Sequence, residues 1–331
     1  MIDWVDFVVR VDHTPINAGH FISLAPGGEL EYDIAKASTI RGSFDSSYRV
    51  RSQGSTDAGT ASELYLSGNP AKFLQGHNVF GSDNIVGLVS EVVNQVFAEF
   101  GIADDLALAR VRKGDFDIKR IDITHSYRFA NRQEVKAVLG ALAIKSRSRR
   151  GRAQTRGGTV YHGINSRRHS FKFYSKGEEL EAGKKHRLPL DLEHTPIKDF
   201  ADNLLRAELT LRSKELQEME IFKGSDVPPQ ILRKLFTEYF GRIEMAAQVD
   251  IASDEMINMP RAIRSTYLLW KEGIDVHPMY SVPTYYRHRS QLLAYGVDIA
   301  LPCEKNGCTV IPMFRQVTGE PVEVPTWAFD Q

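Results

Sequence analysis

Hydrophobic and polar residues alternate along several stretches of the chain, with the period of two that is typical of β-strands. Pro15 ends the first stretch, and residues rich in Gly, Ser and Asn separate the shorter ones. The long stretches are residues 4–11, 118–127, 159–162, 169–174 and 204–212, and shorter ones are residues 30–34, 47–51 and 63–66. The pattern predicts a mainly antiparallel sheet.

Other stretches have the apolar spacing of amphipathic helices. Asp83 is a candidate N-cap for the helix at residues 85–100, which follows a turn-rich segment at 69–84. Helices are also predicted at residues 133–145, 229–247, 260–272 and 283–295, the last three with prolines at or near their starts. We therefore expect an α+β fold: residues 1–225 form an antiparallel sheet flanked by helices, and residues 226–331 a smaller helical domain.

Composition restricts the class of protein. The chain has 331 residues, 42% hydrophobic and 25% charged, with a formal net charge of zero. No apolar run is long enough to span a membrane, and the first residues are acidic where a signal peptide would be basic, so we expect a cytoplasmic protein. The two cysteines, Cys303 and Cys308, cannot make a four-ligand zinc site by themselves, and free thiols are expected.

Positive charge is concentrated in one part of this neutral chain. Residues 145–187 contain 13 Lys or Arg against three Glu. Such a block indicates an anionic partner, with the phosphates of DNA the first candidate, although a solvated basic loop would look the same. The loop at residues 146–158 is too basic and Gly-rich to pack. The candidate phosphate contacts are Arg147, Arg149, Arg150, Arg152, Arg156, Arg167 and Arg168.

The last two predicted helices are a short loop apart, as in a helix-turn-helix. The second contains Arg287, His288 and Arg289, and we expect Arg287 and Arg289 to contact DNA, since a helix with such side chains can reach base edges in the major groove. The alternative is that these residues form an ordinary bundle surface.

A tyrosine in the basic block is the candidate nucleophile. Because strand side chains alternate, Phe171 and Phe173 would enter the core while Lys172, Tyr174 and Lys176 share the other face. A phenol flanked by ammonium groups can attack a phosphodiester and stay attached, because the cations stabilise the developing charge. The alternative is a half-buried sheet tyrosine with solvated lysines.

Two acidic residues on other strands suit a metal ion. Asp122 and Glu208 are hard oxygen ligands for Mg²⁺ or Mn²⁺, and His77, in a turn-rich segment, is the candidate third ligand. Each carboxylate could instead be a cross-strand charge partner. His125 is on the apolar side of its strand and is expected to pack in the core.

Four motifs in this order, NPAKFLQGHNVFG (69–81), RIDITHS (120–126), SRRHSFKFY (166–174) and RAELTLR (206–212), resemble the gene II replication initiators of filamentous phages. The stretch YYRHRSQLLAYGVDI is similar to the C-terminal domain of that family, so the resemblance covers most of the chain.

The resemblance implies an origin-specific, Mg²⁺-dependent nicking and strand-transfer enzyme for rolling-circle replication. A single tyrosine at the position of Tyr174 would take the 5′ phosphate and leave a 3′ hydroxyl as primer. Asp122 and Glu208 would hold the metal. The implied partners are the duplex origin, the displaced single strand, and the host helicase and polymerase in the bacterial cytoplasm.

The chain also departs from related nucleases, because it lacks the His-hydrophobe-His motif of many rolling-circle enzymes, which leaves the third ligand open. Tyr161 is the alternative nucleophile. Two other functions fit the same residues: a DNA-binding replication or copy-control protein without catalysis, and a relaxase or transposase that uses the same tyrosine chemistry.

Overall fold

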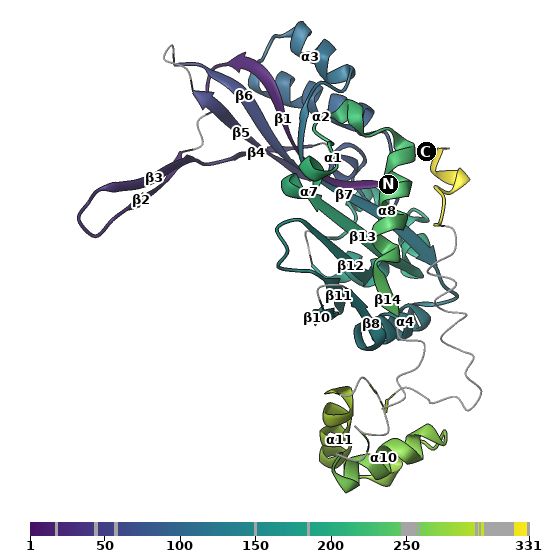
Figure 1. Ribbon diagram of the computed structural model, residues 1–331. Coiled ribbons are helices and arrows are strands. Elements are labelled where there is room, and N and C mark those ends of the chain that lie inside the picture. The colour runs from purple at the N-terminus through teal and green to yellow at the C-terminus, as the bar shows by residue number, and fades with distance from the viewer. Residues whose placement is uncertain are drawn as a thin grey trace.

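The structure is a computed structural model with the predicted α+β fold. It describes residues 1–16, 19–42, 46–55, 59–148, 151–183, 186–245, 256, 259–294, 297, 299–300 and 321–329. Within these residues, the main sheet has nine antiparallel strands (Figure 1). From edge to edge these are β10 (Gln154–Arg156), β11 (Thr159–His162), β12 (His169–Ser175), β13 (Leu204–Arg212), β7 (Asp117–Arg128), β1 (Ile2–His13), β6 (Ala61–Gly68), β5 (Ser47–Ser55) and β4 (Ser38–Arg41).

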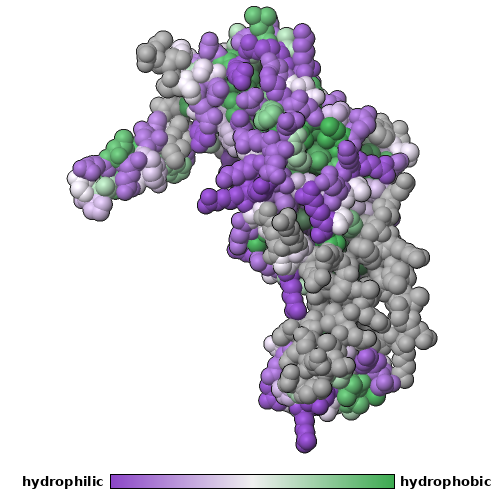
Figure 2. All heavy atoms as spheres, in the orientation of Figure 1, coloured by the Kyte–Doolittle hydropathy of each residue, from purple (hydrophilic) through white to green (hydrophobic). Residues whose placement is uncertain are grey.

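Two smaller sheets accompany the main one. In Figure 1 the hairpin of β2 (His20–Leu24) and β3 (Leu30–Ala35) projects from the body as an arm. Figure 2 shows hydrophobic surface on this arm, where Phe21 and Ile22 are exposed. The other small sheet contains β8 (Ser146–Ser148), β9 (Gly151–Arg152) and β14 (Ile243–Met245). The basic loop predicted at residues 146–158 is therefore wrong for its described residues, because β8, β9 and β10 pair with other strands.

Helices cover the sheet and follow it. Among the described residues they are α1 (Pro70–Gln75), α2 (Ile85–Phe100), α3 (Asp105–Arg112), α4 (Arg132–Lys145), α5 (Lys176–Glu181), α6 (Ile197–Asp202), α7 (Ser213–Glu218), α8 (Pro229–Gly241), α10 (Arg261–Lys271) and α11 (Val282–Ala294). Short 3₁₀ helices are η1 (Leu190–Leu192), η2 (Gly224–Asp226), η3 (His277–Met279) and η4 (Thr326–Phe329).

Local capping accounts for two differences from the sequence prediction. Asn84, not Asp83, is the N-cap of α2, because its side chain accepts the Gly87 N–H at 3.0 Å. Asp83 pairs with the Met1 amino group at 2.9 Å instead. The segment predicted as turns contains α1, whose first residue is Pro70 and whose N-cap is Asn69. Among the described residues, no helix is long and apolar enough to cross a membrane.

The strand alternation predicted from the sequence places one face of β7, β12 and β13 in the main core. Phe171 and Phe173 pack against α8 through Phe236 and Phe240. The helix predicted at residues 229–247 ends earlier, at Gly241. A second core lies under α5 and α6, and α10 and α11 have a core of their own. The division of the chain at residue 225 stays a prediction.

Candidate catalytic site on the polar face of the sheet

The polar side chains of β12, β13 and β7 lie side by side on the face opposite the main core. Lys172 is paired in register with Glu208, and Tyr174 with Arg206. Because paired residues in a sheet point to the same side, these four side chains form one surface. On β7, Thr124 is opposite Glu208, Ser126 is opposite Arg206, and Asp122 is opposite Thr210. The structure thus brings together on one face Tyr174, Lys172, Glu208 and Asp122, which the sequence analysis singled out.

Tyr174 is held against an acid. Its hydroxyl group donates to Glu208 Oε2 at 3.3 Å, and the Lys172 ammonium lies 5.3 Å from the centre of its ring. The side chain is only 9% exposed, and burial raises the pKa of the phenol well above its usual value. The phenol is therefore protonated near neutral pH, and Glu208 is the base within reach of its proton.

Glu208 forms a buried ion pair with Lys172. The Lys172 Nζ lies 2.7 Å from Glu208 Oε1, and Glu208 is 1% exposed. Burial raises the pKa of Glu208 to about 8, against the effect of Lys172, and the negative charges of Asp3 and Asp122 add to the rise. Burial alone would lower the pKa of Lys172, but the Glu208 carboxylate outweighs it and the pKa is raised. Lys172 therefore remains a cation next to the nucleophile.

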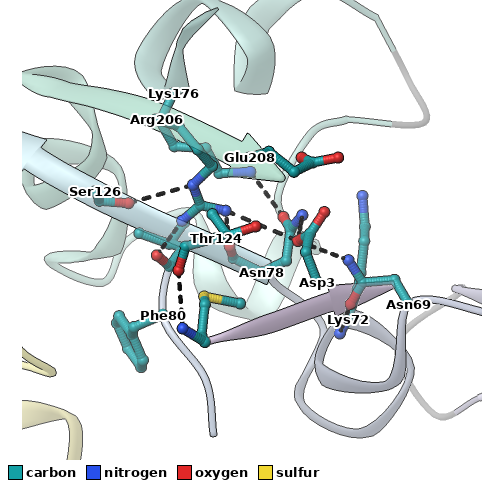
Figure 3. Close-up of polar contacts among 12 residues, drawn as sticks. Asp3, Asn69, Lys72, Asn78, Phe80, Thr124, Ser126, Lys176, Arg206 and Glu208 are labelled. Atoms are coloured by element: carbon teal, nitrogen blue, oxygen red, sulfur yellow. Dashed lines mark hydrogen bonds and ion pairs between the residues drawn. The ribbon is translucent and has the colours of Figure 1, made fainter. Parts of the chain in front are cut away.

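Arg206 organises the middle of this surface and was not singled out from the sequence (Figure 3). Its fully buried guanidinium donates to the backbone carbonyls of Asn78 and Val79 and to Ser126 Oγ at 3.3 Å, and lies 3.9 Å from Asp3. It thereby fixes the segment after α1 onto the polar face. Its place in the RAELTLR stretch, with the same parity as Glu208, was the available signal.

Lys176 reaches the same segment from another direction. It is the first residue of α5, so the prediction that it continues the strand alternation of Lys172 and Tyr174 is wrong. Its ammonium donates to Asn78 Oδ1 at 2.7 Å and pairs with Glu179 at 2.5 Å. Burial lowers the pKa of Lys176 to about 8. Asn78 also donates to Asp3 at 2.7 Å, so these residues form one polar network.

Asp122 and Glu208 both face this surface, but each already has a cation. Arg120 donates to both oxygens of Asp122, at 2.8 and 2.6 Å, and Lys172 pairs with Glu208. Among the described residues, no group of three or more His, Cys, Asp or Glu side chains is placed to hold a metal ion. The oxygen ligands suit Mg²⁺ chemically, but in this arrangement they do not fit a metal site.

His77, the candidate third ligand, lies beside Lys176 and Arg206. Its Nδ1 accepts the Val79 N–H at 3.3 Å, and its ring packs edge-on against Phe80 with centroids 4.5 Å apart. Burial, followed by the charges of Lys176 and Arg206, lowers the pKa of His77 to about 4. Because Nδ1 is an acceptor, the neutral ring has its proton on Nε2. In this tautomer neither nitrogen has a free lone pair for a metal.

The two remaining candidates from the sequence differ in their surroundings. His125 stacks on Phe236 with ring centroids 3.8 Å apart, and burial lowers its pKa to about 3, as expected for a core histidine. Tyr161 is paired in register with Lys172, so it lies on the polar face, one strand closer to the sheet edge than Tyr174.

The predicted DNA-contacting arginines have several environments. Arg152, Arg156 and Arg167 are exposed near the edge of the sheet, whereas Arg168 pairs with Glu215 and Glu218. Arg149 and Arg150 lie outside the described residues, as does the side chain of Arg147.

In α11, Arg287 is exposed and Arg289 is half-buried. His288 is 3% exposed, and its Nδ1 lies 2.8 Å from Thr266 Oγ1. It therefore packs between α10 and α11 and does not present its ring to a partner, unlike the surface that the sequence suggested.

Comparison with known proteins was made over the whole chain. Residues 1–249 match the family described as the N-terminal part of a phage replication-associated protein, and residues 251–331 match the C-terminal part of the same protein. The chain is also 39% identical over 329 residues to the replication-associated protein of Enterobacteria phage I2-2, covering 98% of this chain and 96% of that protein.

Proposed function

The chain belongs to the gene II family of replication-associated proteins of filamentous phages, and we propose that it nicks and rejoins one DNA strand at the phage origin to start rolling-circle replication. The observation that carries the proposal is the contact between the Tyr174 hydroxyl and Glu208 Oε2, with the Lys172 cation beside both. A phenol, a base and a cation on one surface are the groups that covalent attack on a phosphodiester requires.

In the proposed reaction, the phenolic oxygen of Tyr174 attacks the scissile phosphorus. The phenol proton passes to Glu208 Oε2, the new bond joins phosphorus to the tyrosine oxygen, and the bond from phosphorus to the 3′ oxygen breaks. The 3′ oxygen takes a proton from solvent and becomes the primer hydroxyl. Lys172 offsets the negative charge that develops on the phosphate. The reverse reaction rejoins the strand, because the phosphotyrosine bond retains the energy of the broken one.

The ionised form of Glu208 is the one that accepts the proton. Because the pKa of Glu208 is raised to about 8, the fraction in this form grows as pH rises toward that value. The proposed reaction should therefore be faster at pH 8 than at pH 6.

Arg206 and Lys176 act as positioning residues in this proposal. Both hold the segment around Asn78 through buried hydrogen bonds, and that segment covers the polar face next to Tyr174. A rigid surface supports in-line attack, because small displacements of the reacting atoms cost large factors in rate.

The experiment that tests the proposal compares Tyr174→Phe with Tyr161→Phe. Supercoiled DNA with the phage origin is incubated with each protein, and DNA is examined for nicking and for protein on its 5′ end. Tyr174→Phe should abolish both while retaining origin binding, and Tyr161→Phe should retain all three. A 5′ adduct formed by Tyr174→Phe would overturn the assignment, and origin binding without an adduct by the wild-type chain would favour a DNA-binding protein without catalysis.

A requirement for Mg²⁺ or Mn²⁺ is a separate part of the proposal. It is supported by the oxygen ligands Asp122 and Glu208, which would have to leave Arg120 and Lys172 to bind an ion, and the same nicking assay with chelator tests it. The proposed partners are the origin duplex, the displaced single strand, and the host helicase and polymerase that would use the 3′ hydroxyl in the bacterial cytoplasm.

A further inference from the structure

A cavity of about 280 Å³ lies beside the candidate catalytic site, where β7 extends past the start of β1. β1 begins at Ile2, so the edge of β7 beyond Thr124 has no β1 partner. The C-terminal segment at residues 321–324 takes that place: the Val322 N–H donates to the Ser126 carbonyl at 2.8 Å. The cavity is enclosed between this segment, β7 and the residues after α1.

Two aromatic rings form one wall of the cavity. Phe80 and Phe200 both line it, with centroids 6.1 Å apart and planes nearly perpendicular. Trp327 packs against both rings, at 5.7 and 5.8 Å, and the Arg128 guanidinium lies 4.4 Å from the centre of Phe200. The rings are therefore held in place by their neighbours, which suits them to stacking on a flat ligand.

An unsatisfied polar group faces the same space. Thr124 lines the cavity and is 1% exposed, and its hydroxyl has no hydrogen-bond partner among the described residues. A buried hydroxyl without a partner costs free energy, so a ligand that bonds to it would bind more tightly. Ser126, next along the same face of β7, also lines the cavity.

The charges around the cavity do not favour an anion. Asp83 and Glu323 contribute carboxylates, and Arg233 and the Met1 amino group contribute the opposing charge, with Met1 already paired to Asp83. A flat, neutral ligand with hydrogen-bonding edges fits these walls better than a phosphate does. A nucleobase has that chemistry.

We propose that this cavity binds one base of the single DNA strand next to the scissile phosphate. Thr124 is opposite Glu208 in the sheet, and Tyr174 is on the strand beyond, so the cavity is two strand spacings, roughly 10 Å, from the strand of the nucleophile. A nucleotide that neighbours the scissile phosphate can span that separation. The inference rests on the proposed function, which it deepens by assigning a site for strand recognition.

The test uses the Tyr174→Phe protein, so that cleavage does not interfere with binding. Single-stranded origin oligonucleotides, each with 2-aminopurine at one position around the cleavage site, are titrated with the protein. One position should change in fluorescence, and an abasic site at that position should weaken binding roughly tenfold. Adding Thr124→Val or Phe200→Leu should weaken binding of the intact strand but have little further effect on the abasic one.

Two controls separate this result from loss of folding. Thr124→Val removes only a hydroxyl without a partner, so its unfolding free energy should not fall. Phe222→Leu makes the Phe200 change at an exposed ring far along the chain and should leave binding unaltered. Equal losses from the abasic site in all of these proteins would overturn the cavity proposal.

The proposed function fails by a different observation. If wild-type protein forms no Tyr174 adduct on origin DNA, the nicking proposal is wrong whatever the oligonucleotides show. If the adduct forms and Thr124→Val and Phe200→Leu bind every oligonucleotide as the parent does, only the base site is wrong.

Discussion

Replacing Lys172 with methionine should destabilise the protein far more at pH 9 than at pH 6. Lys172 is 32% exposed and pairs at 2.7 Å with Glu208, which is 1% exposed and has a pKa raised to about 8 by burial. At pH 6 roughly one Glu208 in a hundred is ionised. The substitution then removes a hydrogen bond to a largely neutral acid, which costs about 1 kcal/mol.

The additional cost at high pH follows from the protonation of Glu208. Its folded pKa is above the unfolded value near 4.5, so its contribution to stability is full below pH 4.5 and is lost as pH rises through the folded pKa. Without Lys172 the folded pKa rises further, and the loss continues above pH 8. Each pH unit above 8 adds about 1.4 kcal/mol relative to wild type. The expected total at pH 9 is about 2 to 3 kcal/mol.

Urea unfolding at both pH values measures this difference. The comparison needs wild type, Lys172→Met, Glu208→Gln and the double variant, because the double variant removes the group that titrates. In the Glu208→Gln background, the lysine substitution should cost about the same at pH 6 and pH 9. Equal destabilisation of the single variant at the two pH values would refute the reasoning and show that Glu208 is already ionised at pH 6.

Three further predictions use the same kinds of measurement. His125 has a pKa lowered to about 3, so its contribution is full above pH 6.5 and is lost as pH falls; His125→Phe should reduce the loss of unfolding free energy between pH 7 and pH 5 by about 2 kcal/mol. Asn84→Ala should cost about 1 kcal/mol in urea unfolding through the lost cap, whereas a loss that appears only with Asp83→Ala would reverse the capping assignment. In filter-binding titrations at several salt concentrations, Arg287→Ala should weaken binding to the origin more than to random duplex, and equal losses on both would exclude base reading; neutralising Arg156 and Arg167 should weaken binding to both and lower the salt slope by about one unit per lost phosphate contact.

Strand alternation determined much of the candidate site. The period of two in β7, β12 and β13 separates Phe171 and Phe173 from Tyr174, and places Glu208 and Asp122 on polar faces, whatever the rest of the chain does. Motif order identified the family from sequence as well. Both kinds of information are local, so they survive without knowledge of packing.

Only the tertiary structure decided which of these residues contact one another. Alternation gives the face of a side chain but not the strand beside it or the register, and these place Lys172 against Glu208 and bring Thr124 opposite it. The roles of Arg206 and His77 depend on contacts between segments about a hundred residues or more apart. Such pairings form because burial leaves each charge and carbonyl without water and it must find a partner in the folded chain, which a linear pattern of residue types cannot specify.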